Sequence, residues 1–185
     1  MKEKKVKGSL LAIQARFIRA NKDKDWDKYL KQEDWDIISG RVLPSVWYPL
    51  DTFERCGVAV FELMAGGDLK VIRAMGKEST EMLVKGIYKM LPTESGPARA
   101  LSELVNFIRL VFNFGEWRLE KLDEKNVKII FVFGESSPGI ELFCNLMMGA
   151  FEGMIEMGGG KNCSINFAVR EWERDPETIF DIKWT

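Results

Sequence analysis

Reactive side chains are scarce in this sequence, and the most versatile one is missing. The chain contains no histidine, which is the side chain that titrates near neutral pH and the commonest nitrogen ligand of metals. Its absence excludes a histidine-based catalytic triad, a haem held by histidine and a HExxH zinc site. We therefore predict no catalytic residue, no metal site and no cofactor, and we expect that the protein is not an enzyme.

The three cysteines, Cys56, Cys144 and Cys163, are too scattered for a disulfide framework, and none of them forms a CxxC pair. Cys144 and Cys163 would meet if the late helix packs on the strand that follows it. Two thiolates alone make a poor zinc site, because zinc takes four ligands. We expect buried, reduced thiols in a cytoplasmic protein.

Two glycine-rich segments bear on phosphate binding and nucleophilic catalysis. Gly158-Gly159-Gly160-Lys161 lacks the GxxxxGK[ST] spacing and follows a predicted helix, so we interpret it as a helix C-cap and turn. Residues 134–139 lie at a strand-to-helix corner but do not match GxSxG, and Ser136 has no histidine to act as its base. The alternative role for residues 134–139 is weak anion binding at the N-terminus of the helix that follows them.

The charge balance argues against a polyanionic partner. The chain has 27 basic and 28 acidic residues and a net charge of -1, which removes the usual electrostatic signature of nucleic-acid binding. Aromatic and arginine residues alternate in 167–174, but glutamates interrupt them, so we interpret this segment as an exposed strand face. The most apolar segments, 104–114 and 127–133, are shorter than the ~20 residues of a membrane span. The apolar stretch Leu10–Ile13 is too short for a signal peptide.

The elements that position these residues divide the chain in two. Apolar residues at helical spacing predict helices over residues 8–20, 26–30, 33–38, 51–65, 69–75, 78–91 and 97–111, with an extended connector at 44–49. An Asp51–Glu54 pair predicts a capping box at the start of the fourth helix. After Gly115 the spacing of the apolar residues changes from the helical repeat to every second residue, which predicts strands around 117–120, 127–133, 165–169 and 179–184.

Ser137 and Pro138 predict the start of one more helix, which would run to Gly158 between the second and third strands. Gly149 and Gly153 on this helix would admit another backbone at close range, and we expect the sheet there in preference to the helix of a second subunit. The predicted fold class is α+β in a single domain, 1–185. A helical part (1–114) precedes a ββαββ antiparallel-sheet unit (115–185) with a helix packed on one face.

Three short motifs carry a resemblance. Val6-Lys7-Gly8-Ser9, Trp47-Tyr48-Pro49-Leu50 and the ending Phe180-Asp181-Ile182-Lys183-Trp184 resemble an uncharacterised myxobacterial-type domain family. That family is similar to a superfamily of haem-NO-binding domains, vinyl-reductase-type ligand-binding domains and TRAPP vesicle-transport subunits. The likeness covers nearly the whole chain.

The resemblance implies a sensory or small-molecule-binding module, a homodimer, with an apolar pocket between helices and sheet. Haem-NO-binding domains hold the haem iron through a histidine, and this chain has none, so it cannot bind haem in the usual way. The cysteine-rich metal corner of vinyl-reductase-type domains is also absent, because only Cys144 and Cys163 lie in the right part of the chain. We expect the pocket to be lined by Trp47, Tyr48, Phe53, Cys56, Phe143 and Met147.

The function that these features favour is a non-enzymatic sensory or regulatory module that binds an apolar small molecule. The alternative is a homodimerising interaction or assembly module without a ligand. An enzyme would have to use carboxylates or Tyr48 as acid and base, and the sequence locates no such pairing.

Overall fold

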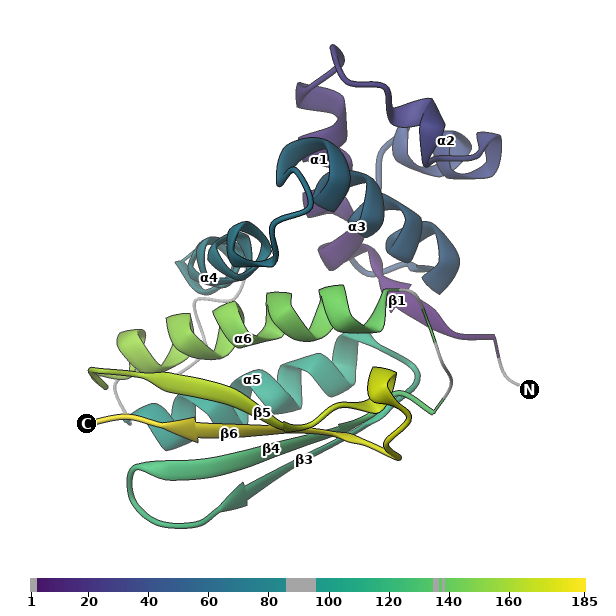
Figure 1. Cartoon of the computed structure of the whole chain (residues 1–185). Coiled ribbons are helices and arrows are strands. Elements are labelled where there is room, and N and C mark those ends of the chain that lie inside the picture. The colour runs from purple at the N-terminus through teal and green to yellow at the C-terminus, as the bar shows by residue number, and fades with distance from the viewer. Residues whose placement is uncertain (1–2, 86–95, 135–136, 138) are drawn as a thin grey trace.

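The computed structural model describes all residues except 1–2, 86–95, 135–136 and 138, and it has the α+β fold that the sequence predicts (Figure 1). The first part contains β1 (Lys5–Lys7), α1 (Gly8–Ala20), the 3-10 turn η1 (Trp26–Lys28), α2 (Gln32–Ile38), β2 (Trp47–Pro49), α3 (Leu50–Met64), α4 (Leu69–Lys85) and α5 (Pro97–Val111). One prediction is wrong here, because the two helices expected over 69–91 are one continuous helix as far as the described residues extend. Gly76, which lies between the two predicted helices, is buried within α4 and packs on another helix.

The second part contains β3 (Glu116–Lys121), β4 (Asn126–Val132), α6 (Ile140–Met157), β5 (Ser164–Val169), the 3-10 turn η2 (Glu171–Glu173) and β6 (Thr178–Lys183). The four strands form one sheet in the order β3-β4-β6-β5, and every neighbouring pair is antiparallel. The predicted ββαββ unit is therefore confirmed. Two helices, α5 and α6, cover one face of this sheet, one more than expected (Figure 1).

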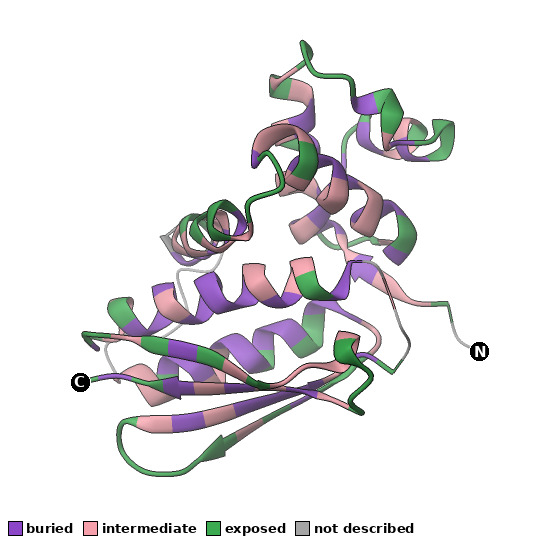
Figure 2. Ribbon diagram, viewed as in Figure 1, coloured by how far each residue is buried: buried purple, intermediate pink, exposed green. Residues whose placement is uncertain are grey.

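The core lies between α6 and the sheet. Phe151 of α6 and Phe180 of β6 are both fully buried, and their rings meet edge to face at 5.2 Å between centroids. The helix α6 is buried around most of its circumference, whereas α1, α2 and α3 keep exposed outer faces (Figure 2). The helix is enclosed because α4 packs on the side that faces away from the sheet.

The contact between α4 and α6 is a direct backbone contact. A Cβ atom built on Gly149 would lie 1.8 Å from the carbonyl oxygen of Arg73, and one built on Gly76 would lie 2.0 Å from the carbonyl oxygen of Leu146. Our expectation that Gly149 faces the sheet is therefore wrong. A helix of the same chain takes this place, and salt bridges from Arg73 to Glu152 (3.1 Å) and from Lys77 to Glu152 (3.7 Å) flank the crossing.

The helical part is held together by one short pair of strands and one buried acid. β1 pairs with β2, and Val6 of β1 also forms a bridge with Phe112 at the end of α5.

The carboxylate of Asp34 on α2 is fully buried and accepts two hydrogen bonds from Arg55 on α3 and one from the amide of Lys31. These contacts fix α2 against α3.

Both predicted helix caps differ from the structure. Helix α3 begins at Leu50 without a side-chain cap, so the Asp51–Glu54 capping box does not form. Helix α6 begins at Ile140, two residues later than expected for Ser137 as N-cap. Ser137 still accepts a hydrogen bond from the amide of Gly139 at 3.1 Å, and its hydroxyl donates to the carboxylate of Glu54, which joins the two helix starts.

None of the helices in the described part of the chain has the length and apolar character needed to cross a bilayer.

Candidate functional site: an apolar cavity between the two parts

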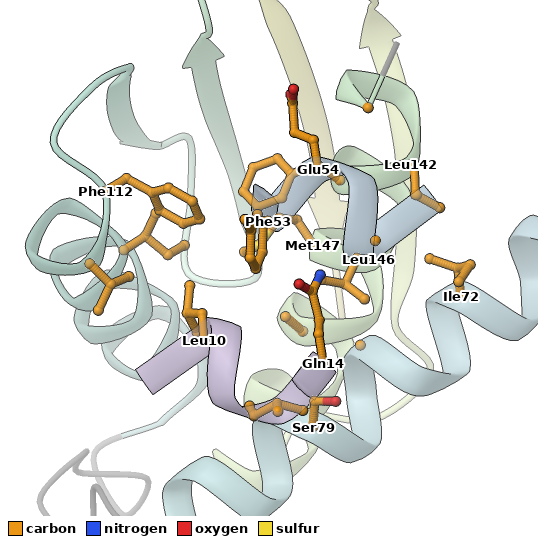
Figure 3. A pocket seen from close by; sticks show the side chains of 18 of the residues that line it. Leu10, Gln14, Phe53, Glu54, Ile72, Ser79, Phe112, Leu142, Leu146 and Met147 are labelled. Carbon is orange, nitrogen blue, oxygen red and sulfur yellow. The ribbon is translucent and has the colours of Figure 1, made fainter. Parts of the chain in front are cut away.

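A cavity of about 160 Å³ separates the first helices from the helices that cover the sheet (Figure 3). Its walls come from α1 and α3 on one side and from α5, α6, β3 and β4 on the other, and α4 contributes to one end. The polar side chains among the described lining residues are few: Gln14, Glu54, Ser79, Thr80 and the indole of Trp117. The cavity therefore lies where the helical part meets the sheet unit, in an almost wholly apolar surrounding.

Regular spacing on the helices creates these walls. Helix α1 contributes Leu10, Ile13, Gln14 and Phe17, which stand three and four residues apart and therefore share one face. On α6, Leu142 and Leu146 follow the same rule and remain half-exposed. Each of these helices thus has one apolar face in the core and a second one toward the cavity.

The wall at the end of α5 is aromatic. The ring of Phe112 meets Phe53 of α3 and Phe143 of α6 edge to face, at centroid distances of 6.0 Å and 5.4 Å. Behind it, Trp117 stacks on Phe131 at 4.1 Å. Edge-to-face and stacked rings are favourable arrangements, so this wall is built from mutually supporting rings contributed by both parts of the fold.

One polar group of the cavity lining has no hydrogen-bond partner within the described part of the chain. The amide oxygen Oε1 of Gln14 is buried and accepts no hydrogen bond from the described residues. Its amide nitrogen lies beside α3, since a Cβ built on Gly57 would lie 3.3 Å from Nε2. In Figure 3 the Gln14 side chain extends from α1 among the apolar side chains of the cavity, which Ser79 of α4 also lines. The hydroxyl of Thr80, by contrast, donates to the carbonyl oxygen of Gly76.

The only charged lining residue in the described structure, Glu54, turns its carboxylate away from the cavity (Figure 3). Burial raises the pKa of Glu54, and the hydrogen bond from Ser137 opposes that rise without cancelling it. Lys4 approaches the same end of the cavity from outside, where its ammonium donates to the carbonyl oxygen of Phe133 at 3.2 Å.

The structure brings half of the predicted site residues to this cavity. Phe53, Phe143 and Met147 line it, and their role in binding stays a prediction. The other three, Trp47, Tyr48 and Cys56, are not among its described lining residues.

Each of these three has another place in the fold. Trp47 lies at the surface on β2 under the ammonium of Lys7, 4.4 Å from the ring centroid. The hydroxyl of Tyr48 accepts a hydrogen bond from the amide of Leu43. Cys56 is fully buried on α3, where burial raises the pKa of its thiol to about 12.

The other two cysteines are also poor nucleophiles and poor metal ligands. Cys144 is fully buried and Cys163 is partly buried, and burial raises the pKa of both thiols, to about 11 for Cys163. No group of three potential metal ligands occurs among the described residues.

Sequence reasoning missed Gln14 and the residues of α1 and α4 that line the cavity. The signal was present in α1, where Leu10, Ile13 and Phe17 form an apolar row beside the buried row of Leu11, Ala15 and Ile18. A second apolar row on one helix indicates a second buried or ligand-facing surface.

The fold belongs to a known structural class. No protein-family model and no curated protein sequence matches the chain. Its fold is similar to that of an H-NOX protein from S. oneidensis in the Fe(II)NO ligation state, with a TM-score of 0.69 over 97% of this chain and 99% of that one, at 11% identity. It is also similar to an Fe(II) unliganded H-NOX protein from K. algicida, with a TM-score of 0.67, 97% and 96% coverage and 12% identity. The chain therefore has an H-NOX-like fold.

The residues of this chain do not fit the haem that this fold class implies. Haem iron needs an axial ligand such as histidine, cysteine or tyrosine; the chain has no histidine, and the described lining contains no cysteine or tyrosine. Met75 and Met147 line the cavity, but methionine commonly serves haem as the partner of a histidine. The acidic haem propionates would also find no lysine or arginine among the described lining residues. The cavity is thus suited to a guest other than haem.

Proposed function

We propose that this protein is a non-enzymatic sensory or regulatory module that binds an apolar small molecule in the cavity between α1, α3 and α6. The observation that carries the proposal is a cavity of about 160 Å³ whose described lining is apolar except for five polar side chains. Binding sites for small molecules are typically apolar hollows with a few polar groups that orient the guest. A protein of this fold has been solved with NO on its iron, which supports a role in small-molecule binding for the fold.

The walls of the cavity suggest how binding would be transmitted. Helix α4 is held to α6 by backbone contact at Gly76 and Gly149, so these two helices move together. Helices α1 and α3 approach α6 across the cavity, where Leu142 and Leu146 stay half-exposed. A guest that fills this space would gain contact with both walls and would therefore favour one relative position of α1 and α3.

A cavity-filling variant tests this function. Gly57 of α3 faces the cavity, and a Cβ there would contact only Gln14 at 3.3 Å and Leu142 at 3.8 Å within 4 Å. We expect small aromatic and aliphatic compounds to raise the Tm of the wild-type protein and of Gly57→Ala, and to lose this effect in Gly57→Leu. Thermal-shift assays and native mass spectrometry provide the readouts. Equal effects on all three proteins would show that the compounds bind elsewhere.

The homodimer remains a prediction. The exposed large apolar residues of the described structure come from several elements, among them Val71 of α4, Leu110 of α5 and Leu122 after β3. Light scattering at micromolar concentration measures the oligomeric state directly, and an assembly module would be dimeric with or without a guest.

A further inference from the structure

We infer that the cavity selects a neutral molecule, an apolar body that carries one hydrogen-bond donor such as a hydroxyl group, and that Gln14 accepts the hydrogen bond from this donor. The inference rests on the proposed function and adds the chemical class of the guest.

Gln14 provides the polar contact. Its Oε1 atom is buried without a partner among the described residues, and leaving a buried acceptor unsatisfied is destabilising. A guest that donates a hydrogen bond to this atom removes that destabilisation, whereas a purely apolar guest leaves it in place. The nitrogen of the same amide lies on the side of Gly57, so the oxygen is the atom that remains for the guest.

The charges around the cavity disfavour an anion. The described lining contains no lysine or arginine, and its one ionisable side chain is the acid Glu54. Lys4 is outside the lining, where it donates to the carbonyl oxygen of Phe133 and lies 4.2 Å from the centroid of the Phe133 ring. A carboxylate guest would therefore be desolvated without a matching cation, which is costly. A cation would gain little from Glu54, because that carboxylate points away from the cavity and binds Ser137 (Figure 3).

The volume of the cavity sets the size of the guest. An engineered apolar cavity of about 150 Å³ binds benzene, and the cavity here is about 160 Å³. It thus holds a body the size of one aromatic ring while the walls stay in place. Phenol, toluene and benzoate share such a ring and differ in the donor and the charge, so they form a matched set of probes.

Isothermal titration calorimetry of the full chain with these three compounds tests the inference. We expect phenol to bind more tightly than toluene and benzoate to bind most weakly. Gln14→Leu should reduce the preference for phenol over toluene by about fivefold, the factor that corresponds to one net hydrogen bond. Gln14→Met repeats the test with a side chain of similar length, should Gln14→Leu fold poorly. Gln32→Leu is the control, because it makes the same change at an exposed position on α2.

The outcomes separate the two proposals. If toluene binds as well as phenol and the Gln14 variants change nothing, the hydrogen bond is refuted while the binding function stands. If benzoate binds most tightly, the neutral class is refuted. If none of the three compounds binds, the proposed function of the cavity fails, and the inference fails with it.

Discussion

Gly149 of α6 touches the carbonyl oxygen of Arg73 on α4, so closely that a methyl group on Gly149 would lie 1.8 Å from that oxygen. The backbones of the two helices are therefore in contact, and neither helix can move away without breaking it. One turn further along α6, Gly153 has more room, since its nearest neighbour would lie 3.4 Å from a Cβ.

These two glycines give a paired prediction. Gly149→Ala should lower the free energy of unfolding by about 3 kcal/mol, the upper part of the usual range for overpacking, because α4 must separate from α6. Gly153→Ala should be neutral or stabilising by up to ~1 kcal/mol, because alanine favours the helix. Urea denaturation measures both. Equal effects of the two changes would contradict the close crossing.

The buried carboxylate of Asp34 gives a second prediction. Asp34→Asn leaves Arg55 without its buried partner, and breaking such a pair costs about 3–5 kcal/mol. Glu33 contacts the same guanidinium from an exposed position, so Glu33→Gln should cost less than about 1 kcal/mol. A loss of similar size in both variants would refute the importance of the buried contact.

The pH dependence of this contact follows from its pKa. Burial alone would raise the pKa of Asp34, but hydrogen bonds from Arg55, the Lys31 amide and Thr52 outweigh burial and hold it below the ordinary value of 3.8. The stabilisation is therefore complete above about pH 3.8 and is lost as the pH falls through the lower pKa of the folded state. The difference in free energy of unfolding between wild type and Asp34→Asn should become smaller in that acid range, as urea denaturation at several pH values would show.

The pH dependence of stability that comes from Glu54 should have the opposite sign. Because burial raises its pKa above the ordinary 4.5, the folded state holds this proton more tightly than the unfolded state. The stabilisation that comes from protonated Glu54 is complete below pH 4.5 and is lost as the pH rises through the pKa of the folded state. Glu54→Gln keeps an acceptor for Ser137 and should raise Tm by about 2–4 °C at pH 7, with a smaller gain at pH 4.5. Glu62→Gln, at an exposed position on the same helix, is the control, and a gain that does not change with pH would refute the assignment.

Periodicity predicted most of the fold, and its errors have physical causes. The change from helical spacing to alternation after Gly115 correctly predicted the four strands, because buried and partly buried residues alternate along much of β4 and β6. The break expected near Gly76 was wrong because glycine suggests the end of a helix and equally permits two helices to touch. Only the packing partner, which lies about seventy residues away at Leu146, distinguishes these two uses.

The site was harder to predict than the fold. Phe53, Phe143 and Met147 lie on helices whose apolar rows are long, and they line the cavity. Trp47 and Tyr48 lie on the three-residue strand β2 and are not among the described lining residues of the cavity. Gln14 was missed because a single polar residue in an amphipathic helix is normally solvent-facing, and only the tertiary structure buries its amide oxygen.

Methionine-methyl NMR can detect whether a small molecule enters the space between α3 and α6. Met75 and Met147 line the cavity, whereas Met154 is fully buried outside the lining and Met82 is exposed. On titration with phenol, we predict saturable shifts of the Met75 and Met147 methyl signals and much smaller changes at Met154 and Met82. Unchanged signals from Met75 and Met147 at saturating phenol, or shifts confined to Met82, would show that phenol does not enter this cavity.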